Sequence, residues 1–153
     1  MVSEKIRSEV MTFLRANLVC VIATVDGDKP EAATIHFLAD DEMNLFFVTR
    51  RQTRKFKNLS ENPNVAIVVG TELAPRTLQI EGEAVEIDES HGDLTKLARR
   101  PGMSDIYAGA ISGDPFADIK GMDFAVFKVI PNWIRWMDLD EKKKKEIYRQ
   151  VVP

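Results

Sequence analysis

The chain of 153 residues has one cysteine, two histidines and no apolar run long enough to cross a membrane. A single cysteine cannot form an internal disulfide, which excludes a disulfide-stabilised secreted scaffold. The best apolar run, from Leu18 to Val25, is interrupted by Thr24 and falls far below the roughly 20 residues that a membrane helix needs. The first residues also lack the basic and apolar regions of a signal peptide. We therefore expect a soluble, cytoplasmic protein.

The usual hydrolytic and metal-binding motifs are also missing. No HExxH, CxxC or Walker-type pattern occurs, and no metal site is expected. Cys20 lies in an apolar stretch, which is typical of an inert core thiol rather than of a nucleophile paired with His36. We expect His36 to be a partly buried strand residue, with a contact to a ligand ring as the alternative. The net charge of −3 is less basic than a nucleic-acid-binding protein usually shows.

Length and composition predict one domain over residues 1–153, with 44% hydrophobic and 29% charged residues. Ser3 is a suitable N-cap for a first helix, and Gly27 suits a tight turn. An insert is expected at 90–121 and a charged tail at 140–153.

The patterns predict helices over 3–16, 52–62 and 89–100, a long loop over 103–120, and strands over 18–25, 31–39, 45–49, 65–70, 76–88, 124–130 and 133–139. Six or seven closely spaced strands favour a small antiparallel β-barrel with peripheral helices.

The most informative segment runs from Arg50 to Lys57 and holds five positive charges and no negative charge. It lies where a strand ends and a helix begins, and the first turn of a helix offers free backbone N–H groups and a positive dipole end. Thr53, Arg54 and Lys55 would add a hydroxyl, a guanidinium and an ammonium, so the segment favours an anion such as phosphate. A solvated basic face that pairs with the acidic stretch 81–93 is an equally good interpretation.

Two other features have both a structural and a functional interpretation. Small residues precede and include Thr34 in the second strand, where they would let a flat ligand approach the backbone, although simple packing explains them as well. Trp133 and Trp136 are three residues apart and face opposite sides of a strand. One of them should pack inward, and the other would be available for a ligand or a subunit interface.

Several patterns occur in a fixed order along the chain. An Asp-Gly-x-x-Pro turn precedes a strand with small residues, and Leu-Phe-Phe-Val-Thr then leads into the basic segment. Lys-x-x-Asn-Leu-x-x-Asn-Pro-x-Val-Ala-Ile-Val-Val follows, and Leu-Gln-Ile-Glu-Gly-Glu-Ala comes later. This order resembles the FMN-binding split-barrel family related to pyridoxamine 5′-phosphate oxidase, over about residues 4–88 and more loosely over 121–139. The resemblance implies a mainly β fold, a six-stranded antiparallel split barrel, and a homodimer with two cofactor sites at the subunit interface.

The resemblance also assigns candidate cofactor-binding residues. It implies that Thr53, Arg54 and Lys55 hold the FMN phosphate, and that Val48 and Thr49 contact the ring or the ribityl chain. It implies polar contacts to the ring for Thr34 and Gln79. It also implies that Trp133 or Trp136 reaches the site of the partner subunit. His36 stays a candidate cofactor-binding residue through the ring contact described above. The phosphate hypothesis requires the cations that follow the third strand to converge on one anion.

The sequence lacks the Arg-x-His substrate signature of the authentic oxidase. We therefore expect an FMN-dependent oxidoreductase with an unassigned substrate, and no catalytic acid or base is identified. A deazaflavin (F420) or haem, with His36 or His91 as an axial ligand, is the alternative cofactor. A non-enzymatic flavin reservoir or sensor is the third interpretation.

Overall fold

A computed structural model describes residues 3–70, 75–88, 123–139 and 148–152. The helix predicted over 89–100, the loop over 103–120, the insert at 90–121 and most of the tail lie outside these residues. Among the described helices, none has the length and apolar character of a membrane span.

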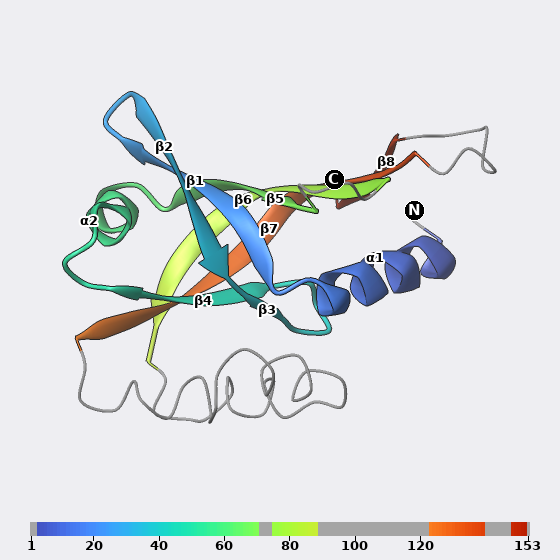
Figure 1. Ribbon diagram of the computed structural model, residues 1–153, viewed down its shortest axis with the longest axis horizontal. Coiled ribbons are helices and arrows are strands. Elements are labelled where there is room, and N and C mark those ends of the chain that lie inside the picture. Colours follow the sequence, from blue (N-terminus) through green and yellow to red (C-terminus); the bar gives the residue numbers. More distant parts are fainter. Residues whose placement is uncertain (1–2, 71–74, 89–122, 140–147, 153) are drawn as a thin grey trace.

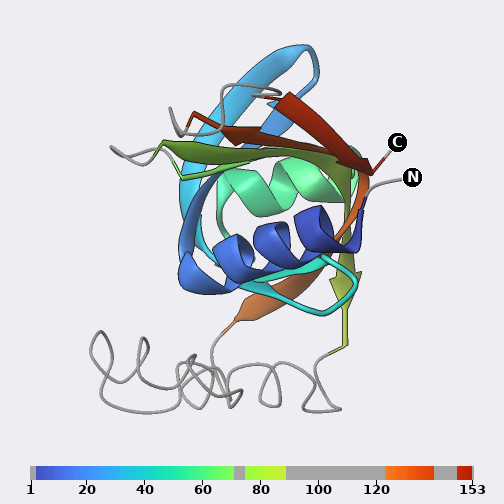
Figure 2. The same cartoon turned by 90° about the vertical axis from the view of Figure 1, so that its right-hand side faces the viewer.

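Two helices and eight antiparallel strands make up the described part of the chain. The strands form one sheet in the order β2-β1-β5-β6-β7-β4-β3, and β8 is added to β7. The sheet curls strongly, with α2 at one end and α1 at the other (Figures 1 and 2). The elements are α1 (Glu4–Ala16), β1 (Val19–Asp26), β2 (Lys29–His36), β3 (Leu38–Ala39), β4 (Leu45–Arg50), α2 (Arg54–Glu61), β5 (Asn64–Val69), β6 (Arg76–Ile87), β7 (Phe124–Asp138) and β8 (Tyr148–Val152).

The strand count differs from the predicted six or seven. Residues 124–130 and 133–139 form one strand, β7, because Pro131 stays within it at an irregularity in its pairing with β6. Glu81 pairs with Trp133 and Gly82 with Pro131, so Asn132 is an extra residue. A Cβ atom on Gly82 would lie 2.4 Å from the carbonyl oxygen of Ile130, which explains why glycine stands there.

Two further strands also depart from the prediction. The stretch 31–39 divides into β2 and the two-residue β3, and β3 pairs with β4. The end of the expected charged tail forms β8, in which Val151 is buried. Val151 thus packs in the hydrophobic core of the sheet.

The inner face of the curled sheet forms the core. One cross-strand row aligns Ile22, Ile67, Ile80 and Ile134 on four neighbouring strands, and each is at most 1% exposed. Such rows of β-branched side chains stabilise a sheet by packing across strands and by removing apolar surface from water.

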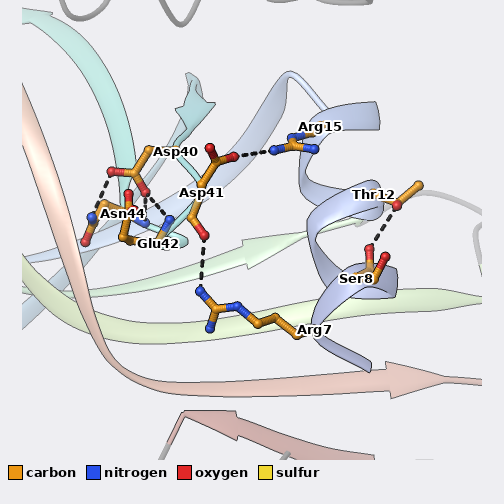
Figure 3. Close-up of polar contacts among 8 residues, drawn as sticks. All are labelled: Arg7, Ser8, Thr12, Arg15, Asp40, Asp41, Glu42 and Asn44. Atoms are coloured by element: carbon orange, nitrogen blue, oxygen red, sulfur yellow. Dashed lines mark hydrogen bonds and ion pairs between the residues drawn. The ribbon is translucent and has the colours of Figure 1, made fainter. Parts of the chain in front are cut away.

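Helix α1 closes one end of this core. Ser3 caps it by accepting a hydrogen bond from the backbone N–H of Ile6, as the sequence predicted. Its outer side is tied to the β3–β4 turn, where Arg7 donates to the carbonyl of Asp41 at 3.1 Å and Arg15 pairs with the Asp41 carboxylate (Figure 3). Asp40 shapes that turn by accepting hydrogen bonds from the backbone N–H groups of Glu42 and Asn44 and from the Asn44 amide.

Candidate functional site

Two threonines fix the passage from β4 into α2. The Thr53 hydroxyl accepts from the backbone N–H of Phe56 at 3.2 Å and donates to the carbonyl of Arg50 at 2.9 Å. The hydroxyl of the buried Thr49 lies 3.0 Å from that of Thr53. These bonds satisfy one of the free N–H groups of the first helical turn. Both predicted ligand residues therefore have a structural role at the start of α2.

The five cations of the Arg50–Lys57 segment have different partners within the described part of the chain. The guanidinium of Arg50 lies over the ring of Phe124, at 5.7 Å from its centroid. Carboxylates from other elements pair with three of the remaining cations: Arg51 with Glu86 and Asp123, Arg54 with Glu31, and Lys57 with Asp26. Glu86 belongs to the acidic stretch 81–93. Pairing of the basic segment with this stretch was the alternative interpretation to a phosphate site.

Lys55 has a different environment from the other four cations. Its side chain is half-buried, and Nζ lies 6.0 Å from the centroid of the buried Phe47 ring. Burial lowers the pKa of Lys55, and the Cys20 thiol has a smaller, opposite effect. Among the described residues, no carboxylate lies within ion-pair distance of Lys55. This amine at the positive end of a helix would gain from an anionic partner.

Cys20 lies near Lys55 on the inner face of β1. Burial raises the pKa of Cys20 to about 12, and Lys55 lowers it slightly. The thiol therefore stays protonated at neutral pH, which agrees with the inert core thiol predicted from the sequence.

A buried polar network joins α2 to the β1–β2 hairpin. The amide of Asn58, 1% exposed, donates 3.0 Å hydrogen bonds to the hydroxyl of Thr24 and to Oε2 of Glu31. Oε1 of Glu31 lies 2.8 Å from a guanidinium nitrogen of Arg54. The sequence patterns do not predict this network, although Asn58 belongs to the Lys-x-x-Asn-Leu pattern. Its partners on the hairpin are 27 and 34 residues away, so no local signal shows them.

The outer face of the sheet holds a second group of predicted residues. Strand pairing aligns one row across this face: Thr34, Val21, Val68, Gln79 and Arg135. Thr34 is exposed, and Gln79 accepts a hydrogen bond from Nε of Arg135 at 2.9 Å.

The remaining aromatic and histidine predictions have clear outcomes. Trp136 is buried against Phe13, with ring centroids 4.9 Å apart, while Trp133 is half-buried with Arg135 over its ring. The two tryptophans thus face opposite sides, as predicted.

His36 is exposed at the end of β2, so the expectation of a partly buried side chain is wrong. β2 lies at one end of the strand order, where nothing in the sheet covers this residue.

The candidate residues therefore lie in two places in the chain. Arg54 and Lys55 lie at the end of the barrel that α2 covers, while Thr34 and Gln79 lie on the outer face of the sheet. Val48 also faces outward, since it packs with the second apolar cluster of Leu38, Phe46 and Val126. No described group of three or more His, Cys, Asp or Glu residues is placed to hold a metal ion.

The sequence model of the pyridoxamine 5′-phosphate oxidase family matches residues 6–138. The chain belongs to this family. Over 87 residues it is 30% identical to the pyridoxine/pyridoxamine 5′-phosphate oxidase of Anaplasma marginale (strain St. Maries). That alignment covers 56% of this chain and 40% of the relative, so the chain spans less than half of the relative's length.

Solved structures of other proteins share the split-barrel architecture. A FAD-binding protein from Mesorhizobium loti matches with a TM-score of 0.59 and 15% identity, over 87% of this chain and 90% of that protein. A haem-binding protein from Mycobacterium smegmatis matches with a TM-score of 0.65 and 18% identity, over 99% of this chain and 60% of that protein. At these identities the likeness shows a common fold.

Proposed function

We propose that this member of the pyridoxamine 5′-phosphate oxidase family binds FMN and acts as an oxidoreductase. Arg54 and Lys55 would hold the phosphate at the start of α2. The observation that carries the proposal is the environment of Lys55, whose half-buried amine has no carboxylate partner among the described residues. A phosphate dianion would supply the missing charge and would also accept hydrogen bonds from the first turn of α2.

The residues of the first turn fit this group in chemistry and in exposure. Arg54 is 80% exposed on its side chain, and one of its guanidinium nitrogens lies 2.8 Å from Oε1 of Glu31. A guanidinium has five N–H donors, more than a single carboxylate oxygen uses, so the same side chain can also donate to a phosphate. When bound, FMN supplies the hydride or electron transfer, and the protein supplies binding and orientation.

The proposal includes a homodimer. Thr34 and Gln79 could hydrogen-bond the polar edge of a flat ring lying on the outer face of the sheet. Because Arg54 and Lys55 lie at a different place in the same protomer, a site that uses both groups needs a second copy of the chain. Trp133, which faces outward beside Gln79, would then lie at the subunit interface.

The fold of the FAD-binding protein from M. loti supports a flavin as the ligand class. The substrate and the electron donor remain unassigned, because the chain spans only 40% of the A. marginale relative.

The test is an absorbance spectrum of the purified protein together with the mass of the small molecule that it releases. We expect flavin bands and FMN. The double variant Arg54→Glu/Lys55→Glu should lose the cofactor, whereas Lys5→Glu/Lys57→Glu, with the same change in net charge, should keep it. Circular dichroism checks that both variants fold. Retention of FMN at wild-type affinity by the first variant would contradict the phosphate assignment.

Haem is a second candidate ligand, since the haem-binding protein of M. smegmatis shares the fold and His36 is exposed. The same spectrum distinguishes the two, because haem has an intense Soret band and His36→Ala would remove an axial ligand. A deazaflavin would be identified by its mass. Rapid reduction of bound FMN by a nicotinamide cofactor would exclude a purely storage or sensor role.

A further inference from the structure

The Glu31 carboxylate forms an ion pair with Arg54, one of the two cations that we assign to the phosphate. Its side chain is 12% exposed, and both oxygens are engaged, one by Arg54 at 2.8 Å and the other by the buried Asn58 at 3.0 Å. Because Asn58 also donates to Thr24, the carboxylate is held on both sides. Glu31 is therefore a fixed negative charge next to the anion site.

This charge limits how much negative charge the site can accept. Glu31 balances Arg54, so the first turn of α2 offers the charge of Lys55 and the helix dipole. A terminal phosphate group carries about −1.5 to −2 at neutral pH, whereas a terminal diphosphate carries roughly one charge more. The repulsion by Glu31 increases with each added charge, because Coulomb energy is proportional to the product of the charges.

We propose that Glu31 is a specificity-determining residue that selects ligands ending in a single phosphate group over ligands ending in a diphosphate. The inference rests on the proposed function, since it concerns the same site. Its consequence is that nucleoside diphosphates and triphosphates gain less affinity from Arg54 and Lys55 than they would without Glu31. A negative charge beside Arg54 lowers the affinity for diphosphates while FMN can still bind.

A merely structural role for Glu31 predicts a different result. If the carboxylate only held Arg54 and Asn58 in place, its removal would weaken the binding of pyrophosphate at least as much as that of phosphate, because the attraction by Arg54 also increases with the charge of the ligand. The direction of change in the ratio of the two affinities separates the roles: loss of a repulsive charge raises the preference for pyrophosphate, whereas loss of orientation lowers it or leaves it unchanged.

The experiment measures how inorganic phosphate and inorganic pyrophosphate displace FMN from the full-length protein at low, fixed ionic strength without divalent cations. Glu31→Gln should raise the preference for pyrophosphate over phosphate on the order of fivefold relative to wild type. Glu31→Ala is the second neutral variant and should shift the ratio in the same direction. Glu31→Asp, which keeps the charge, should retain the wild-type ratio.

Glu61→Gln is the matched control, because it removes one negative charge from the exposed end of the same helix. Its ratio should equal that of the wild type. A ratio in Glu31→Gln or Glu31→Ala that matches the control would overturn the inference while FMN binding stands. Failure of the wild-type protein to bind FMN at all would instead overturn the proposed function.

Discussion

Lys55 lies in an electrostatically unfavourable position. It occupies the second position of α2, near the positive end of the helix, and its side chain packs toward Phe47 and Cys20. Lysine is usually favoured at the opposite end of a helix. The unfavourable position is explained if a ligand, rather than another side chain, supplies the counter-charge.

Replacement of Lys55 by methionine should stabilise the ligand-free protein at pH 7, by roughly 1 kcal/mol, because an apolar group replaces an uncompensated half-buried charge. The folded-state pKa lies below the ordinary value of 10.5, so the unfolded chain binds more protons in the interval between them. The wild-type penalty is complete below the folded pKa and is relieved as the pH rises through that interval. The gain of Lys55→Met should therefore shrink towards pH 10.5, as urea denaturation at pH 7 and pH 10 would measure.

Lys57→Met is the control for that comparison, because Lys57 is exposed and its replacement should not give this gain in stability. Cys20 is present in all three proteins, so its ionisation in the unfolded state largely cancels in the differences. An equal effect at both sites would show that Lys55 carries no burial penalty.

At the scale of elements, α2 is held by polar side chains as much as by apolar ones. Thr53 caps its start, and Asn58 joins its buried side to the β1–β2 hairpin. Buried hydrogen-bonded groups are costly to leave unpaired, so this network determines where α2 sits on the sheet.

Asn58→Ala should lower the free energy of unfolding by about 1–3 kcal/mol, because it removes two hydrogen bonds and leaves the Thr24 hydroxyl and a Glu31 oxygen without that donor. Ser60→Ala, on the exposed side of the same helix, should change stability by less than about 0.5 kcal/mol. Chemical denaturation of both variants measures the difference. Equal stabilities would mean that the network does not hold the helix.

At the scale of the whole molecule, bound FMN should be coupled to stability. A ligand that binds only the folded state adds about 2.7 kcal/mol at a concentration 100 times its dissociation constant. We therefore expect FMN to raise the melting temperature and riboflavin, which lacks the phosphate, to raise it less. Calorimetry of the protein freed of cofactor would measure both shifts. Equal shifts would show that the phosphate contributes nothing to binding.

The sequence by itself determined the elements whose signals are local. The Ser3 cap predicted the start of α1, and the patterns over 52–62 and 76–88 predicted α2 and β6. These signals depend on neighbours a few residues away, so they can be interpreted before any tertiary contact exists.

Only the tertiary structure decided the continuity of β7, the pairing of β8 and the partners of the five cations. Pro131 is a strong local signal for a break, yet pairing with β6 carries the strand past it through a single irregularity. The charge pattern predicted Arg54 and Lys55 as candidate anion ligands. The sequence did not predict that Glu31 and Asn58 lie close to them. Ion pairs and buried hydrogen bonds depend on distance in space, and the fold alone brings residues far apart in the chain within that distance.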